Sequence, residues 1–501
     1  MRWWLIGFLG LAIVGAVAAW GAPKLAGRLA PIQVGLLHSR TGPMKISEEP
    51  MVEAELLAIE EINAGGGLLG GRLIEPVIAD GRSDWPTFQR EAERLITSDR
   101  VRVIFGCWTS ASRKSVRPVV EEHHHLLFYP MAYEGLEESP NIIYTGAAPN
   151  QQVIPAVKWS YDHIKARRYF LAGSDYVWPH AVNAIARDYI GSLGATVAGE
   201  EYVLYGSTDV DDLVAAIKRV RPDVVISTVV GDTNLPFYRK LAEAGLGPRE
   251  VPVISFSIAE AELRHMPARD LVGDYAAWNY FQSIDSEANR EFVRKFKARW
   301  GSDRVTSDVM VAAYNSVWLW AQAVAEADTT EIAAVHKAVV RQSLSAPEGI
   351  ISVDATTEHT WRPVYIGRIR GDGQFDIVWT SDKAVRPVPY PTTRPRSEWE
   401  SFLEELYHAW GGWGNTGATV TRVRSGSGPA ASPSPPSPGT RPVPATKPGS
   451  APARKKAPGP ATTRPTTTTT PGKAAAWRQN TTVRARTGDG VAVRRTYSSP
   501  R

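Results

Sequence analysis

The feature that most constrains the fold is a regular alternation of short apolar segments with longer amphipathic ones. It begins with the apolar segment 32–37, which is followed by apolar residues at helical spacing from Val52 to Ile62. Short apolar runs indicate strands that are buried on both faces, and connections of about a dozen residues or more are long enough for helical crossovers. We therefore expect an α/β fold built on parallel sheets with right-handed crossovers.

The alternation breaks near Asn150 and then restarts, which indicates two lobes, each a doubly wound, Rossmann-like sheet. A long helix is expected over 309–325, and the segment 349–380 reads as antiparallel strands with a hairpin turn at 371–373. Segments that return after the second lobe can complete the first one, so a multi-strand hinge should join the lobes. The expected strands cover residues 32–37, 73–79, 101–105, 126–129, 169–172, 196–204, 223–230 and 251–256.

This pattern predicts lobe one over residues 31–149 and about 281–346. Lobe two should cover 150–280 and about 347–400. The other expected parts are an N-terminal segment over 1–30, a helical extension over 401–425 and a tail over 426–501.

The N-terminal segment resembles an export signal. A positive start, Met1-Arg2, precedes an apolar run from Trp3 to Trp20. Its 18 residues also just span a bilayer. Cleavage near Ala16–Ala18 and retention as a membrane anchor both stay open, and in either case we expect a periplasmic or extracytoplasmic body.

The C-terminal tail differs from the rest of the chain in composition. Residues 426–501 contain 14 of the 37 prolines and 13 lysines and arginines against one acid, Asp489. Such a segment cannot bury enough apolar area to offset its chain entropy, so we expect it to lie outside the fold. The chain before the tail carries a net charge of −7. The overall charge of +5 therefore does not indicate a nucleic-acid partner.

Motifs typical of enzymes and metal sites are weak in this chain. Residues 65–70 match G-x-G-x-x-G, but they follow a helix and precede a strand, the reverse of the order in dinucleotide-binding sites. His123–His125 are consecutive and so point in different directions, which disfavours a shared metal ion. The single cysteine, Cys107, is expected to be a small buried residue. We therefore expect no enzymatic activity, no cofactor and no metal site.

The residues directly after the expected strands are the candidates for ligand binding, because open α/β sheets bind ligands at the carboxyl ends of their strands. They are rich in aromatic and hydroxyl side chains and contain no lysine or arginine, which favours a small neutral ligand over a phosphate. The set comprises residues 38–39, 107–110, 129–133, 175–178, 231–233 and 257–260.

Several segments resemble, in the same order along the chain, the urea and short-chain amide substrate-binding proteins of ABC importers. The resemblance covers about Ile32 to Pro391, and Trp108-Thr109-Ser110 is closer to the urea binders than to the amide sensors, which tend to carry tyrosine at the position of Trp108. The segments that carry it are 105–114, 127–135, 146–152, 173–179, 276–281 and 346–349.

The resemblance implies the type I periplasmic binding protein fold, with the ligand held between two lobes. It also implies ABC permease subunits as partners, to which the protein would deliver urea or a short-chain amide, and membrane contact through residues 1–30 if they are not cleaved. A receptor that reports the same ligands to a regulatory partner is the alternative. The implied ligand-binding residues are Trp108, Ser110, Tyr129 and Met131 from lobe one and Tyr176, Trp178, Asp232 and Ser257 from lobe two.

Overall fold

The computed structural model describes residues 29–415, so the expected export segment and the basic tail lie outside the described residues. The chain divides into two units, Met1–Val423 and Arg424–Arg501, and the fold described here belongs to the first.

Lobe one is built on a five-stranded parallel sheet in the order β2-β1-β3-β4-β5. Its central strands are buried on both faces, as their apolar sequences predict. The elements are β1 (Ile32–His38), α2 (Lys45–Ala64), β2 (Ile74–Asp80), α3 (Trp85–Thr97), β3 (Ile104–Gly106), α4 (Ser110–Glu122), β4 (Leu127–Tyr129) and β5 (Ile142–Tyr144).

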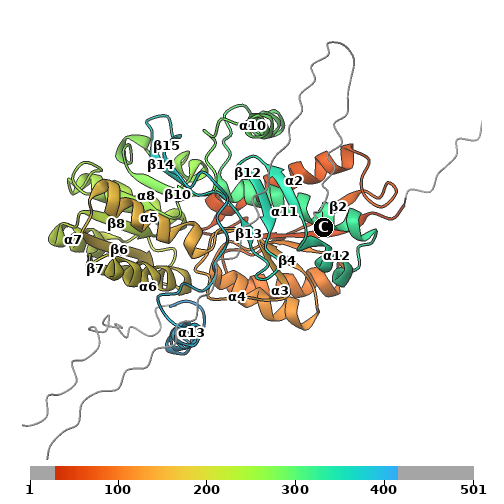
Figure 1. Ribbon diagram of the computed structural model, residues 1–501, viewed down its shortest axis with the longest axis horizontal. Helices are drawn as coiled ribbons and strands as arrows, with labels where there is room; N and C mark the ends of the chain where they lie inside the picture. The colour runs from red at the N-terminus through yellow and green to blue at the C-terminus, as the bar shows by residue number, and fades with distance from the viewer. Residues whose placement is uncertain (1–28, 416–501) are drawn as a thin grey trace, which may run out of the picture. The chain divides into compact units, whose positions relative to one another are not determined.

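Lobe two is built on a seven-stranded sheet in the order β15-β14-β10-β9-β8-β6-β7 (Figure 1). Most of its elements follow one another along the chain from residue 149 to residue 278, and short 3-10 or π helices among them are labelled η. These elements are η1 (Pro149–Gln151), α5 (Val153–Trp159), η2 (Ser160–Ile164), β6 (Arg168–Ser174), α6 (Val177–Ser192), β7 (Thr196–Val203), α7 (Asp211–Val220), β8 (Val224–Thr228), η3 (Gly231–Thr233), α8 (Asn234–Glu243), β9 (Val253–Ser255), α9 (Glu260–Leu263), η4 (Ala268–Asp270) and β10 (Tyr275–Trp278). The strands β6 to β10 pair in parallel, and β14 joins β10 antiparallel.

The rest of the chain returns to both lobes. The remaining elements are α10 (Glu287–Trp300), α11 (Asp308–Ala327), α12 (Ile332–Val339), β11 (Ser343–Ala346), β12 (Gly349–Val353), β13 (Thr360–Trp361), β14 (Tyr365–Ile369), β15 (Phe375–Thr380) and α13 (Arg396–Trp410). Helix α11 packs along α2 of lobe one, whereas the hairpin β14–β15 extends the sheet of lobe two. The antiparallel region and its hairpin turn are thus confirmed.

Three crossing segments of the chain meet at the hinge, as the discontinuous lobes require. The Asn279 side-chain amide donates to the carbonyl of Gln151 at 3.1 Å and to that of Pro363 at 2.7 Å. Asn279, on the second crossing, therefore links the first crossing at Gln151 to the third crossing at Pro363.

One segment differs from the expected lobe boundaries. Residues 349–361 were expected in lobe two, but Ile351 and Val353 of β12 pack in one core with Val34 and Leu36 of β1. The reason is that the small sheet β11-β12-β13 lies against α11 and so follows lobe one.

Candidate functional site

The residues directly after β3 and β6 lie where the two lobes meet. Trp108 stands between β3 and α4, Tyr176 stands between β6 and α6, and the two helices contact each other. The first N–H groups of a helix have no partner within it. In α4 the N–H of Ser112 donates to the hydroxyl oxygen of Thr109 at 3.1 Å, and in α6 the N–H of Val177 donates to the carbonyl of Trp413 at 3.0 Å. Two of the strand ends that were expected to carry ligand-binding residues therefore lie where the lobes meet.

A strained bend places Trp108 at the lobe boundary. Gly106 has a φ of 152°, and a Cβ there would lie 2.1 Å from the carbonyl oxygen of Leu37. Cys107 follows with a φ of 64°, a left-handed conformation that costs a non-glycine residue roughly 1–2 kcal/mol. Its N–H donates to the Leu37 carbonyl at 2.9 Å, and its side chain is fully buried, as predicted. Burial raises the pKa of the Cys107 thiol and so disfavours the reactive thiolate at neutral pH.

Aromatic side chains from both lobes pack against one another at this boundary. The ring centroid of Trp85 lies 5.3 Å from that of Tyr205 and 6.1 Å from that of Tyr176, and the two tyrosine rings lie 5.5 Å apart. Trp178 lies 6.4 Å from Tyr176. We call these four residues, together with Trp108, the aromatic wall.

Several polar atoms of the aromatic wall are buried without a hydrogen-bond partner. They are the indole nitrogens of Trp85, Trp108 and Trp178 and the hydroxyls of Tyr176 and Tyr205. Buried donors nearly always have partners in native proteins, which makes these atoms candidates for hydrogen bonds to a bound molecule or to water.

Sequence reasoning missed Trp85 and Tyr205. Tyr205 comes two residues after β7 ends at Val203, so the rule of strand ends could have included it. Trp85 begins α3, where the Asp84 side chain accepts a hydrogen bond from the N–H of Thr87 at 3.0 Å and so caps the helix. Only the tertiary contact with lobe two identifies Trp85 as part of the wall.

Glu48 is a second residue that sequence reasoning missed. Its side chain, in the first turn of α2, is buried, and one carboxylate oxygen accepts from the N–H of Ser39 at 2.6 Å and lies 3.9 Å from Nδ1 of His38. The other oxygen, Oε1, has no partner. Burial raises the pKa of Glu48 to about 7, and the carboxylate in turn helps to raise the pKa of the Tyr205 hydroxyl, whose main cause is burial. The site therefore has a buried acceptor beside the aromatic wall.

Two predicted residues of lobe one already have hydrogen-bond partners in the protein. The Tyr129 hydroxyl donates to the carbonyl of Trp108 at 2.7 Å, and the Ser110 hydroxyl bonds to a carboxylate oxygen of Glu134. The side chains of Tyr129 and Ser110 thus form hydrogen bonds within the protein. The N–H of Ser110, at the first position of α4, remains a candidate donor to a ligand.

A buried ion network lies behind Trp108. The guanidinium of Arg113 bonds to Glu137 at 2.8 Å and to Glu134 at 3.0 Å, and it lies 4.7 Å from the ring centroid of Tyr129. Lys114 bonds to Glu137 at 3.0 Å. Although burial alone would raise it, the neighbouring cations Arg113 and Lys114 lower the pKa of Glu137. These cations are therefore neutralised by carboxylates of the protein.

The structure does not bring Asp232 and Ser257 into the aromatic wall. Ser257 is buried, and its hydroxyl donates to the carbonyl of Val229, within lobe two. Asp232 is partly exposed where the lobes touch, and its N–H donates to the carbonyl of Pro43 at 3.2 Å. Met131, also predicted as a ligand-binding residue, is buried after β4.

The lobes are closed on each other beside the site. A Cβ at Gly231 of lobe two would lie 2.6 Å from the Pro43 carbonyl oxygen of lobe one, and α2 contacts both η3 and α9. A cavity of about 270 Å³ opens at the outer edge of this contact, lined by Lys45, Glu49, His265 and Arg304 among others. Of the aromatic wall, Trp108, Tyr176 and Trp178 are buried, whereas Trp85 and Tyr205 are partly exposed.

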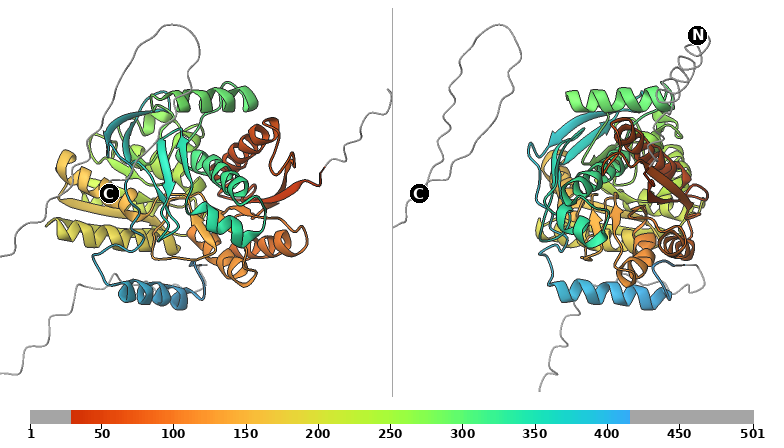
Figure 2. Two further views of the ribbon diagram at one scale, coloured as in Figure 1. Left: turned by 45° about the vertical axis from the view of Figure 1, so that its right-hand side comes forward. Right: turned by 90° about the vertical axis from the view of Figure 1, so that its right-hand side faces the viewer.

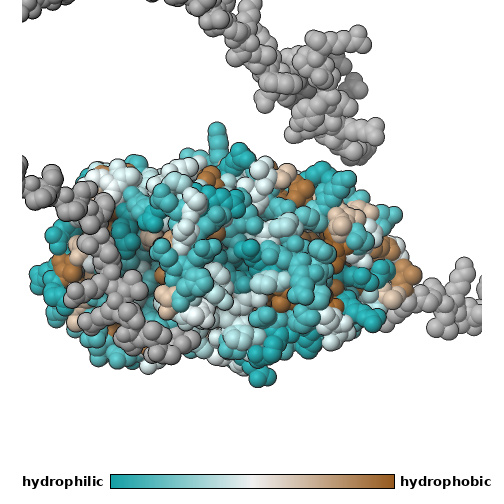
Figure 3. Space-filling model, turned by 90° about the horizontal axis from the view of Figure 1, so that it is seen from below, coloured by the Kyte–Doolittle hydropathy of each residue, from teal (hydrophilic) through white to brown (hydrophobic). Residues whose placement is uncertain are grey.

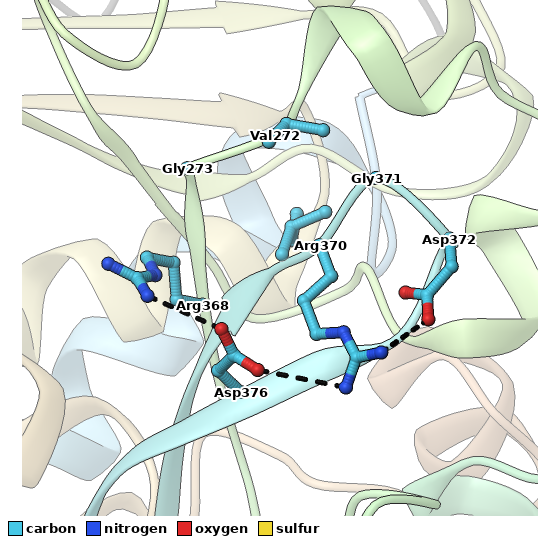
Figure 4. A pocket seen from close by; sticks show the side chains of 8 residues that line it. Val272, Gly273, Arg368, Arg370, Gly371, Asp372 and Asp376 are labelled. Carbon is cyan, nitrogen blue, oxygen red and sulfur yellow. Dashed lines mark hydrogen bonds and ion pairs between the residues drawn. The ribbon is translucent and has the colours of Figure 1, made fainter.

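A second cavity lies on the surface of lobe two and has no free charge. It has a volume of about 550 Å³ and lies at the β14–β15 hairpin (Figure 4). Arg370 pairs with Asp372 at 2.5 Å, and Arg368 pairs with Asp376 at 3.3 Å. Because each cation already faces a carboxylate, this hollow is a poor anion site.

In the view of Figure 3, polar residues predominate and apolar residues form scattered spots. Within residues 29–415, no helix is long and apolar enough to cross a membrane.

Comparisons with known proteins match the two-lobed fold. The periplasmic binding protein domain family matches residues 32–396. A solute-binding protein of an ABC transporter from Rhodopseudomonas palustris BisB5, solved with 3,4-dihydroxybenzoic acid, has a TM-score of 0.66 and 21% identity, over 71% of this chain and 98% of its own. Leu/Ile/Val-binding protein homolog 8 from Brucella abortus (strain 2308) is 23% identical, over 55% of this chain and 71% of its own length.

A third match carries the name of an enzyme. Limonene hydroxylase from Geobacillus stearothermophilus is 33% identical over 127 residues, and the chain spans only 23% of that protein's length. Solved structures that share the fold include the solute-binding protein of an ABC transporter named above and a leucine-binding protein from Thermotoga maritima MSB8. The chain belongs to the periplasmic binding protein domain family and has the type I periplasmic binding protein fold predicted from its sequence.

Proposed function

We propose that this protein is an extracytoplasmic solute-binding protein that encloses urea or a short-chain amide between its lobes and delivers it to an ABC importer. The family of the chain supports the transport role and the location outside the cytoplasm. ABC permease subunits would be the partners. The resemblance to urea and amide binders supports the choice of ligand.

The observation that carries the ligand proposal is the pairing of one buried acceptor with several buried donors. Oε1 of Glu48 is an acceptor without a partner, and the indole nitrogens of Trp108 and Trp178 are donors without partners. Urea and simple amides are planar and neutral, with N–H donors and a carbonyl acceptor. Such a molecule could satisfy both kinds of atom, and the surrounding aromatic rings would strengthen each hydrogen bond by excluding water.

The same site is poorly suited to a carboxylate ligand such as the dihydroxybenzoic acid bound by the R. palustris relative. A bound carboxylate needs a cation or several donors, and it would be repelled by the ionised form of Glu48. The nearby buried cations, Arg113 and Lys114, are paired with Glu134 and Glu137. This charge balance favours a neutral solute.

A titration of the full chain by calorimetry with urea, formamide, acetamide, leucine and 4-hydroxybenzoate tests the proposal. Urea has four non-hydrogen atoms, so a ceiling of about 1.5 kcal/mol per atom limits binding to roughly −6 kcal/mol, or a Kd of tens of micromolar. Binding of leucine or 4-hydroxybenzoate, with no response to millimolar urea or amides, would overturn the ligand proposal.

The variant Trp178→Ala tests whether Trp178 takes part in ligand binding. We expect it to weaken binding by about 1–3 kcal/mol because it removes a donor and part of the wall. Trp379→Ala, on the edge strand β15 of the same lobe, is the control and should bind as the unmodified chain does. Equal affinity of both variants would assign Trp178 to the core instead.

A further inference from the structure

The last described residues cross from one lobe to the other. We call residues 411–415 the strap. They follow α13, which contacts α6 of lobe two and lies at the lower edge in Figure 1 and in the left view of Figure 2.

The strap binds lobe two through its backbone, next to the aromatic wall. Gly414 pairs antiparallel with Tyr176, and the N–H of the residue after Tyr176 donates to the carbonyl of Trp413 at 3.0 Å. The side-chain amide of Asn415 donates to the Asp175 carboxylate at 2.8 Å. The strap is thus bonded along the segment that holds Tyr176.

The strap also contacts lobe one. The Trp413 ring centroid lies 4.8 Å from Nζ of Lys114 in α4. Gly414 lies against Trp85 so closely that a Cβ would be 2.0 Å from the far edge of the indole ring. That ring cannot simply swing away, because Tyr205 and Tyr176 pack against it. Gly414 therefore touches a wall residue of each lobe.

We infer that the strap positions the ligand site: it holds Trp85 of lobe one against Tyr176 and Tyr205 of lobe two and so stabilises the closed lobes. An element that contacts both lobes only when they are closed shifts the equilibrium towards the closed form and raises the apparent ligand affinity. This inference rests on the proposed function only in that the lobes enclose a solute, and it does not depend on which solute.

Gly414→Ala in the full chain tests the inference, with Gly412→Ala as its matched control. A Cβ at Gly412 meets nothing within 4 Å, so the control makes the same change in the same strap without a clash. Spin labels on Ser98→Cys in lobe one and Ser192→Cys in lobe two, both exposed positions, report the distance between the lobes without ligand. Cys107 is fully buried and stays unlabelled.

We expect Gly414→Ala to shift the distance distribution to longer values and to raise the Kd for urea and acetamide about tenfold, the size of a modest coupling between closure and binding. Gly412→Ala should change neither. If Gly414→Ala folds poorly, Trp413→Ala serves instead, since its ring is partly exposed and its loss removes the Lys114 contact.

If Gly414→Ala shows the same distance between the lobes and the same Kd as Gly412→Ala, the proposed role of the strap is wrong. The proposed ligand would not be affected by that result. Longer distances in a protein that binds neither urea, formamide nor acetamide would support the strap and overturn the ligand proposal. The two proposals can therefore fail separately.

Discussion

Glu48 and the tryptophans of the aromatic wall have buried polar atoms that lack a hydrogen-bond partner. A buried polar atom without a partner costs about 1–3 kcal/mol, so each of these atoms would gain from a hydrogen bond to a ligand or to water. Glu48 differs from the others because it can exchange a proton near neutral pH. Its ionisation should therefore be linked to ligand binding.

We predict that ligand binding releases a proton through Glu48. Burial raises the pKa of this carboxyl to about 7, so it is mostly protonated at pH 6 in the free protein. A ligand N–H stabilises the ionised form and lowers the pKa, so proton release should be largest near pH 6–7 and absent near pH 8.5. Calorimetry in two buffers with different ionisation enthalpies measures this release.

Two variants control this experiment. Glu48→Gln should bind more weakly and release no proton. Glu49→Gln changes the next residue of α2, which is partly exposed beside Arg40 and Lys45, and should behave as the unmodified chain does. Proton release that persists in Glu48→Gln would assign the linkage to another group, such as His38, whose pKa is raised by Glu55 against the effect of burial.

At the scale of elements, α4 connects the ligand site to the core. Its first residue, Ser110, follows the strained bend at Cys107, and its next turn carries Arg113 and Lys114 into the buried ion network. Thr109 caps the helix, since its hydroxyl oxygen accepts from the N–H of Ser112 at 3.1 Å. The placement of Trp108 thus depends on a helix that is held by buried charges.

We predict that Arg113→Met destabilises the protein by about 3–5 kcal/mol, because it leaves Glu134 and Glu137 short of a partner in the interior. Guanidinium chloride unfolding measures the change, and urea is avoided because it is a candidate ligand. Arg294→Met removes an exposed pair with Glu291 at 2.8 Å and should leave the unfolding midpoint almost unchanged, because solvent screens this pair. Similar small effects of both variants would show that the buried network is energetically replaceable.

At the scale of the whole molecule, acidic side chains of both lobes are buried near the contact between α2 and α9. Glu48 comes from α2 of lobe one, and Glu260 and Glu262 come from α9 of lobe two, which contacts α2. Burial raises the pKa values of Glu48 and Glu262 to about 7 and that of Glu260 to about 8. The folded protein therefore holds protons that the unfolded chain has already lost.

We predict that the ligand-free protein becomes less stable as the pH rises from 5 to 8. In this range the folded state binds more protons than the unfolded state, so the free energy of unfolding falls with rising pH and levels off above about pH 8. Melting temperatures in ligand-free buffer should decrease accordingly, and Glu260→Gln should reduce the slope. A melting temperature that increases over this range would contradict the prediction.

We also predict that removing the chain beyond about Thr421 leaves folding and ligand affinity unchanged. The reason is its composition, which is rich in proline and basic residues and poor in apolar ones. A chain that ends at Thr421 should melt within a few degrees of the full chain, whereas one that ends at Trp410 also lacks the strap and should bind more weakly. A larger loss of melting temperature on the first truncation would assign the tail a structural role.

Much of the architecture was predictable because its signal is local. The apolar segments at 32–37 and 169–172 became the buried parallel strands β1 and β6, and the glycine-rich turn at 371–373 joins β14 to β15. Burial on both faces requires such runs whatever the partner strands are. The sequence does not predict the short strand β5, and it predicts the wrong lobe for residues 349–361. In both cases the local sequence pattern does not indicate which element the segment will pack against.

The sequence alone determined the two-lobed fold and the strand ends at which Trp108, Tyr176 and Trp178 lie. Only the tertiary structure decided that Glu48 and Trp85 join them, and that the hydroxyl of Ser257 bonds within its own lobe. The physical reason is that strand and helix patterns depend on neighbours along the chain. The composition of a site between two lobes depends instead on how those lobes close, and on which groups closure leaves without a partner.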